Sequence, residues 1–186
     1  MSGALRIEGY AVISEDGMIA DASGKLPAAL VAEADQQFFE HGLHGVDFVV
    51  HGRNSEENDA HSAHRRRIIV THRVSAVAPD PHRATAILWN PAGAPFADAV
   101  AALEMPCRSA AILGGTEVFG RFLDLYDLFF LSRIAGVRLP GGHPVFPQVP
   151  GKTPETVLAA HGLGDAGPEL KDPAARLIIL RWERRA

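Results

Sequence analysis

The chain has 186 residues, a formal net charge of -4 at pH 7 and 47% hydrophobic residues. A chain of this length and apolar content can bury most of its unfolded surface around one core, so we expect a single domain over residues 1–186. The negative net charge gives no general attraction to nucleic acid or to anionic lipid, and we expect neither as a partner.

Targeting and redox features are absent from the sequence as it stands. Cys107 is the one cysteine, so an internal disulfide is excluded and an oxidising compartment is not implied. The first six residues do not form a basic segment followed by a long apolar run, and no later stretch approaches the roughly 20 apolar residues of a membrane span. We therefore expect a soluble, cytoplasmic protein with no membrane association.

Short apolar runs alternate with segments of helical spacing along the chain. Runs rich in branched residues predict strands at residues 9–14, 47–51, 68–71, 86–89, 110–113, 128–132 and 177–182. Helical spacing predicts helices at residues 28–41, 96–103 and 116–123. This order predicts an α/β fold with a largely parallel sheet covered by helices on both faces. Residues 136–152, rich in proline and glycine, predict a long surface loop without a regular element.

The first predicted helix carries an acid on its apolar side. Helical spacing places Val31, Asp35, Phe38 and Phe39 on one face, so that a carboxylate interrupts an apolar stripe. Burial raises the pKa of such a group, and a carboxyl that holds a proton near neutral pH can assist protonation of a substrate. The alternative is that Asp35 lies at the edge of the stripe, solvated or paired with an arginine.

Polar or glycine-rich turns follow three of the predicted strands. These turns are Gly52, Arg53, Asn54 and Ser55; Thr71, His72 and Arg73; and Gly114, Gly115 and Thr116. In parallel sheets, ligands bind beyond the carboxyl ends of strands, and basic groups and helix N-termini attract phosphate. Paired glycines let a backbone approach a pyrophosphate closely, and Thr116 can act as a helix N-cap. Ordinary tight turns with exposed basic side chains are the alternative.

Two other kinds of chemistry are not expected. His41 with His44, and His61 with His64, have helical spacing, but no cysteine or carboxylate set accompanies either pair with a recognisable metal spacing. We therefore expect no metal site. The sequence also contains no Gly-x-Ser-x-Gly nucleophile elbow.

Taken in order, these motifs resemble the dihydrofolate reductase superfamily over nearly the whole chain, from Tyr10 to Arg185. Residues 11–20 resemble its first strand and the start of its mobile loop, and residues 35–39 its helix of an acid, two residues and two aromatics. Residues 52–55 and 114–119 are similar to its two cofactor turns, and residues 130–134, 146–147 and 182–185 to its late strands and loop. The resemblance implies a three-layer fold with a mixed, mostly parallel sheet of about eight strands flanked by helices.

The resemblance also implies a function, an NADPH-dependent reductase that transfers a hydride to a pterin or pyrimidine ring. Asp35 would organise proton delivery to the ring, and Ser132 would be the hydroxyl bonded to that acid. Phe39 and Arg65 would contact substrate, with Arg66 and Arg67 as alternatives for the arginine. The cofactor residues would be Val12, Ile19, Gly52, Arg53, Asn54, Ser55, Thr71, His72, Arg73, Leu113, Gly114, Gly115, Thr116, Glu117, Val118 and Phe119. A cis peptide is expected between Gly114 and Gly115.

The substrate stays open between two branches of the superfamily. The first loop lacks the Leu-Pro-Trp pattern of true dihydrofolate reductases, and residues 14–20 are closer to the Ser-x-Asp-Gly-x-Ile-Ala of the riboflavin-pathway reductase. Residues 132–134 and 144–147 are closer to dihydrofolate reductase. The alternatives are a 5-amino-6-(5-phosphoribosylamino)uracil reductase of riboflavin biosynthesis, and a nucleotide-binding relative without turnover. The sequence does not specify the oligomeric state, although relatives of the riboflavin type often form homodimers.

Overall fold

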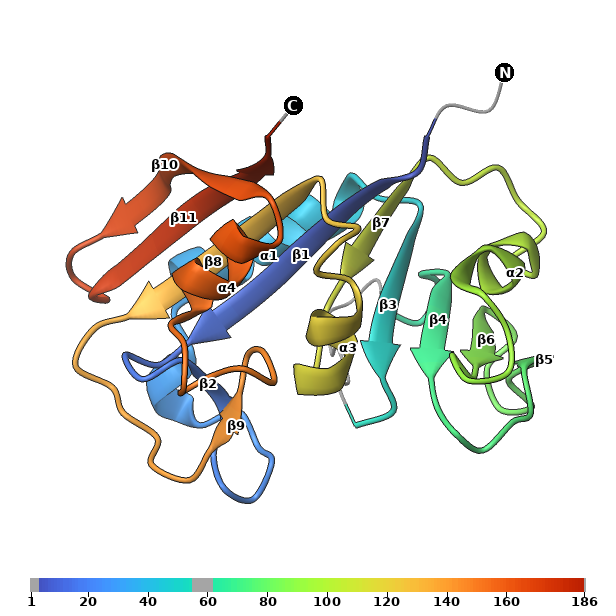
Figure 1. Ribbon diagram of the computed structural model, residues 1–186, viewed down its shortest axis with the longest axis horizontal. Coiled ribbons are helices and arrows are strands. Elements are labelled where there is room, and N and C mark those ends of the chain that lie inside the picture. Colours follow the sequence, from blue (N-terminus) through green and yellow to red (C-terminus); the bar gives the residue numbers. More distant parts are fainter. Residues whose placement is uncertain (1–3, 55–61, 186) are drawn as a thin grey trace.

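The computed structural model describes residues 4–54 and 62–185. In this part of the chain a nine-stranded sheet has the order β10-β11-β8-β1-β7-β3-β4-β6-β5 (Figure 1). Its strands are β1 (Arg6–Ile13), β3 (Phe48–Gly52), β4 (Arg67–Val70), β5 (Val77–Pro79), β6 (Ala86–Trp89), β7 (Ser109–Ile112), β8 (Leu128–Ile134), β10 (Leu163–Asp172) and β11 (Leu177–Arg184). The strands β2 (Met18–Ala20) and β9 (His143–Pro144) form a separate two-stranded ribbon.

The sheet is mixed and mostly parallel. Strands β8, β1, β7, β3, β4 and β6 run parallel to one another, whereas β5 at one end and β11 and β10 at the other are antiparallel to their neighbours. The parallel strands therefore end at one common edge, the lower edge in Figure 1.

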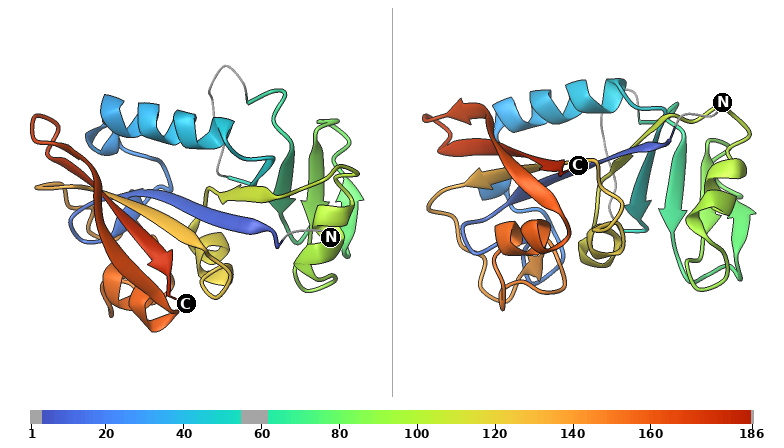
Figure 2. Two further views of the ribbon diagram at one scale, coloured as in Figure 1. Left: turned by 90° about the horizontal axis from the view of Figure 1, so that it is seen from above. Right: turned by 45° about the horizontal axis from the view of Figure 1, so that its top comes forward.

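Helices cover both faces of this sheet, which gives three layers. The helices are α1 (Glu33–His44), α2 (Phe96–Ala101), α3 (Thr116–Arg121) and α4 (Pro154–Ala160), and a short 3-10 helix, η1 (Ala28–Leu30), precedes α1. Figure 2 shows α1 on one face and the other three helices on the opposite face. No helix in the described ranges has the length and apolar character that crossing a membrane requires.

The alternation of side chains along β1 divides the core between these two faces. Ile7, Ala11 and Ile13 belong to the large cluster that packs beneath α2, α3 and α4. Tyr10 points to the other face, where it packs with Leu43 of α1. Strand β1 is thus buried on both sides.

The predicted fold class is confirmed, with differences at the margins of the sheet. All seven predicted strands are present within a few residues of their expected bounds. The sheet has nine strands, where the resemblance implied about eight. Strands β5 and β10 are the two members of the sheet that the apolar runs did not predict. Strand β5 is only three residues long, and β10 carries glycine, proline and several charges. The helix α4 was also missed.

Two sequence interpretations were wrong in detail. The segment 136–152 is not wholly irregular, because it contributes the two residues of β9 that pair with β2. The helix expected from residue 28 to 41 is broken, since η1 ends at Leu30 and α1 begins only at Glu33. Pro27 directly precedes η1, and the extended backbone of Val31 and Ala32 separates η1 from α1.

The glycine at the centre of β1 is required by close packing, which gives a testable prediction. A Cβ on Gly9 would lie 2.3 Å from Cδ2 of Phe129 and 2.9 Å from Cε1 of Tyr126, and both rings are buried. We expect Gly9→Ala to lower the free energy of unfolding by about 1–3 kcal/mol in urea denaturation, because overpacking forces shifts in a rigid core. The control is Gly45→Ala, where φ is -88° and a Cβ would lie 3.4 Å from the Gly42 carbonyl oxygen. Equal stability of the two variants would contradict this account.

Candidate active site

The candidate site lies on the α1 face, where three parallel strands reach the common carboxyl edge. Val12 of β1 and Ser132 of β8 are direct neighbours in the register of these strands. Leu113 follows β7, the strand on the other side of β1, and packs in the same cluster as Tyr10. The first turn of α1, which carries Asp35, lies over this face. The fold therefore brings together residues that are far apart in the sequence.

Asp35 and Ser132, the predicted catalytic pair, interact directly. Burial raises the pKa of the Asp35 carboxyl above its ordinary value of 3.8, and a hydrogen bond from the Ser132 hydroxyl opposes that rise by stabilising the carboxylate. Ser132 is only 4% exposed, so its hydroxyl has little access to water. A carboxyl in this setting holds its proton to higher pH than a solvated aspartate does.

The two glycine-containing turns meet at the same edge. The Gly52 N–H donates to the Gly114 carbonyl at 2.7 Å, which joins the end of β3 to the turn after β7. The Gly114–Gly115 peptide is cis, so that prediction is confirmed. Gly114 has φ 97°, and a Cβ there would lie 2.5 Å from Cε2 of Phe119. Only glycine fits this position.

The predicted phosphate-binding residues surround that edge with differing exposure. Arg53 and Asn54 follow β3 and are exposed, and His72 and Arg73 are exposed after the neighbouring strand β4. Thr71 is buried, and its hydroxyl accepts a hydrogen bond from the Arg73 N–H at 3.2 Å. The last predicted member, Ser55, lies outside the described residues.

Two local predictions about the site were wrong. Val31 is not on the apolar face of α1, because it precedes the helix and is 46% exposed. Thr116 is not the N-cap of α3, since it is the first helical residue and Gly115 occupies the cap position. The Thr116 hydroxyl instead donates to the Pro144 carbonyl, which joins α3 to β9.

The remaining candidate residues differ in what a ligand could reach. Val118 and Phe119 are buried in the core beneath α3, whereas Glu117 is exposed. Val12 and Leu113 are half-buried on the α1 face, as is Phe39, whose ring makes an edge contact with Tyr10 at a centroid distance of 5.9 Å. Ile19 packs against the core on the opposite side of the sheet.

The structure separates the three consecutive arginines at the start of β4. Arg67 is fully buried, and its Nη1 lies 3.3 Å from Nε2 of His51. Arg66 is exposed and lines a hollow beside β5 and the end of α2, away from Asp35. Arg65 is half-buried and stays the candidate for a substrate contact.

The sequence did not lead us to predict a set of hydrogen bonds that centres on Asp16, in the loop after β1. The Ser14 hydroxyl donates to Oδ1 of Asp16 at 2.6 Å, and the Leu139 N–H donates to the same oxygen at 3.1 Å. These bonds join the loop after β1 to the long loop after β8. A serine and an aspartate two residues apart, just after a buried strand, were the available signal.

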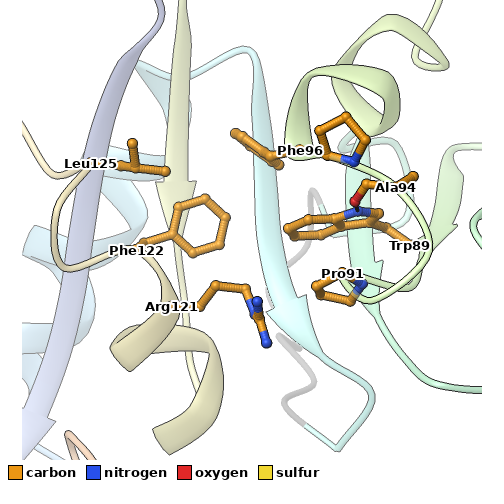
Figure 3. A pocket seen from close by; sticks show the side chains of 8 residues that line it. Trp89, Pro91, Ala94, Phe96, Arg121, Phe122 and Leu125 are labelled. Carbon is orange, nitrogen blue, oxygen red and sulfur yellow. Dashed lines mark hydrogen bonds between the residues drawn. The ribbon is translucent and has the colours of Figure 1, made fainter.

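A separate hollow of about 220 Å³ lies between α2 and α3. Figure 3 shows the side chains that line it. Its lining includes Trp89, Phe96, Arg121 and Phe122, and none of the predicted site residues. Trp89 and Phe122 are only 3% and 0% exposed, so their rings are packed into the core beneath the hollow. Within the described residues, no group of three or more histidine, cysteine, aspartate or glutamate side chains is arranged to hold a metal ion.

Comparisons with known proteins find similarity in structure and none in sequence. No protein-family model matches the chain, and no curated protein sequence matches it. A putative riboflavin biosynthesis protein from Shewanella sp. PV-4 is 19% identical, with a TM-score of 0.65 over 98% of this chain and 100% of that chain. Dihydrofolate reductase from Enterococcus faecalis, complexed with NADP(H) and RAB-propyl, is 17% identical, with a TM-score of 0.64 over 97% of each chain.

A third match is a longer protein with two activities in its name. The diaminohydroxyphosphoribosylaminopyrimidine deaminase/5-amino-6-(5-phosphoribosylamino)uracil reductase of Thermotoga maritima is 15% identical, with a TM-score of 0.67 over 97% of this chain. This chain spans 57% of that protein's length. The sheet order, the three layers and these matches together show that the chain has the dihydrofolate reductase-like fold.

Proposed function

We propose that this protein is an NADPH-dependent reductase that transfers a hydride to a pterin or pyrimidine ring. The observation that carries the proposal is the contact between Asp35 and Ser132 on the sheet face that adjoins the cis Gly114–Gly115 turn. An acid with a raised pKa lies there, on the face toward which Leu113 packs just before this turn. Reductases among the structural matches, one of them complexed with NADP(H), support the same reaction class.

The residues at the carboxyl edge fit a dinucleotide. Two strand ends joined by the Gly52–Gly114 hydrogen bond lie at this edge, and in a parallel sheet a pyrophosphate would bind beyond such strand ends. The exposed Arg53, His72 and Arg73 supply positive or hydrogen-bonding groups nearby for a further phosphate. Val12 and Leu113 would form an apolar wall on the α1 face, where a nicotinamide ring would lie.

When bound, NADPH supplies the hydride, and the protein supplies position and a proton. Asp35 would direct a proton toward a ring nitrogen or oxygen of the substrate, with Ser132 fixing the orientation of its carboxyl. Phe39 and Arg65 would contact the substrate beyond the reacting ring. The half-buried walls exclude part of the solvent, which keeps the acid protonated more easily than in water.

The riboflavin-pathway pyrimidine reductase is the second candidate, favoured by the match to the reductase of Thermotoga maritima. A single panel decides between the candidates, in which NADPH absorbance is followed with dihydrofolate and with the ribosylaminopyrimidine phosphate. Turnover of one substrate assigns the protein to that branch. Tight NADPH binding with no oxidation in the presence of either substrate would instead favour a non-catalytic nucleotide-binding protein.

The basic residues predict a preference between cofactors. We expect NADPH to bind more tightly than NADH by roughly 1.5–3 kcal/mol, the value of one charged hydrogen bond. Arg53→Gln should reduce that difference, because it removes a positive group near the expected phosphate. Isothermal titration of both cofactors measures it, with the exposed Arg83→Gln as a control far from the edge. Equal affinities of the wild-type protein for the two cofactors would defeat the assignment.

Substitution of the acid should separate binding from chemistry. Asp35→Asn keeps size and polarity but cannot gain or lose the carboxyl proton, so we expect kcat to fall by roughly 10²–10⁴. NADPH affinity should be nearly unchanged, and the loss should shrink at low pH, where solvent can protonate the substrate directly. Steady-state kinetics between pH 5 and 8 test this. Wild-type turnover by the variant throughout that range would remove Asp35 from the mechanism.

Asp35→Asn, which should lower kcat, should raise the free energy of unfolding at neutral pH. Because burial raises the pKa of Asp35 in the folded state, the folded protein binds this proton more tightly than the unfolded chain, and ionisation of Asp35 destabilises the fold as pH rises. Asp35→Asn should therefore unfold at a higher urea concentration than wild type at pH 7. The gain should disappear as pH falls below the ordinary value of 3.8, where both states carry the proton. A gain that is independent of pH would show that desolvation of the carboxylate is not its cause.

A further inference from the structure

Four aromatic rings join α1 to the sheet immediately next to the candidate acid. Tyr10 of β1 stacks on Phe130 of β8 with ring centroids 5.0 Å apart. Phe38 of α1 meets Phe130 edge-on at 5.1 Å, and Phe39 meets Tyr10 edge-on at 5.9 Å. We call these four residues the aromatic clamp. Its rings connect three elements, β1, β8 and α1.

The register places the clamp one step from the catalytic pair. Tyr10 pairs with Phe130, and two residues further along the same strands Val12 pairs with Ser132. Side chains two residues apart on a strand share a face, so Ser132 lies next to Phe130 on the α1 side of the sheet. On the helix, Phe38 and Phe39 are three and four residues after Asp35 and lie on the same side of α1. The helix position over the Tyr10–Phe130 pair therefore sets where Asp35 meets Ser132.

The sheet side of the clamp is anchored. The Tyr10 hydroxyl donates to Oε2 of Glu8 at 2.6 Å, and Glu8 in turn pairs with Arg6 at 2.7 Å. The helix approaches closely above this anchor, since a Cβ on Gly42 would lie 2.5 Å from the Tyr10 hydroxyl oxygen. Tyr10 cannot easily move without breaking a buried hydrogen bond or striking the helix.

We propose that Phe38 and Phe130, held by Tyr10, are positioning residues for Asp35. They fix how closely the first turn of α1 approaches the sheet, and with it the burial of Asp35 and its contact with Ser132. This inference rests on the proposed function, because it assigns a role to residues that act through the candidate acid. The clamp controls how much water reaches the carboxyl. Loosening it lets α1 rise from the sheet, so that Asp35 becomes hydrated and loses its fixed distance to Ser132.

The experiment compares two phenylalanines on one strand. Phe130→Leu weakens the clamp, whereas Phe129→Leu removes a ring of the same size from the opposite face, where Phe129 packs against Phe119 and Phe146. Titration of the Asp35 carboxyl by carbon-13 NMR is the first readout, assigned by its absence in Asp35→Asn, and it needs no substrate. Burial and the Ser132 hydrogen bond are the influences identified on this carboxyl, so a change in its titration reports on them.

In Phe130→Leu we expect the pKa of Asp35 to fall toward its ordinary value as the carboxyl becomes hydrated, because burial has a larger influence on this pKa than the Ser132 hydrogen bond that opposes it. We expect kcat to fall about tenfold with a smaller change in KM, because the acid is misplaced in the reacting complex while most substrate contacts remain. Phe129→Leu should lower the thermal midpoint comparably but leave the Asp35 titration and kcat near wild type. An unchanged Asp35 titration in Phe130→Leu, or an equal shift in Phe129→Leu, would overturn the proposal.

Two further variants keep the test decisive. Phe38 is half-buried, so Phe38→Leu is the substitute if Phe130→Leu does not fold, and it should lower the pKa of Asp35 in the same direction. Phe38→Tyr retains the ring and should restore both the titration and kcat. Failure of the proposed function is distinguishable, because it would show as wild-type turnover in Asp35→Asn, whereas the clamp is judged on the carboxyl titration alone.

Discussion

The parallel pairing of β1 with both β7 and β8 is the constraint on which the rest of the site depends. It brings the carboxyl ends of three strands to one edge and fixes which side chains share a face. A slip of β1 by one residue would turn Val12 away from α1 and into the opposite layer, so that it no longer lay beside Ser132 on the same face. The close contact of Gly9 with the Phe129 ring opposes such a slip, because only glycine at that point lets the ring pack against the strand.

Placing an acid on this face has an energetic cost that the surrounding packing must offset. The carboxyl of Asp35 is desolvated and has one identified hydrogen-bond partner, Ser132, so its ionised form is less stable there than in water. Burial of the carboxylate destabilises the packing of the first turn of α1 on the sheet, and the aromatic rings one turn later hold the helix against the sheet. Burial that weakens the fold at neutral pH is the same burial that makes the carboxyl suitable as a proton donor, so stability and activity oppose each other at this residue.

Sequence patterns revealed the fold where apolar runs were uninterrupted and failed where tertiary contacts decide the structure. The central strands were predicted because strands buried on both faces consist of consecutive apolar residues. Strand β10 could not be recognised in the same way, since its charged, glycine-containing and proline-containing sequence lies at the edge of the sheet. Val31 was assigned to the wrong surface because the helical period was extended across the break after η1, which the pattern of apolar residues does not reveal.

The site itself was only partly accessible to reasoning from spacing. The interrupted apolar stripe identified Asp35, but nothing local to Ser132 indicated that the two side chains meet, and that expectation came from the resemblance alone. The aromatic clamp was not predicted, although Phe38 and Phe39 were visible as a pair, because stacking of Tyr10 on Phe130 depends on strand register. Register is set by contacts between strands that are far apart in the sequence, so the spacing of residues along one segment does not reveal it.

The arrangement separates the proposed cofactor and substrate ends by the kind of group that forms them. At the proposed cofactor end, the backbone of Gly52 and Gly114 forms the edge of the sheet, and the hydrogen bond between these two strand ends fixes its conformation. At the proposed substrate end, the groups are side chains, Phe39 of α1 and Arg65 before β4, which take no part in the backbone pairing of the sheet. One scaffold can therefore keep a dinucleotide site while the ring substrate varies, which agrees with a fold shared by a dihydrofolate reductase and a pyrimidine reductase.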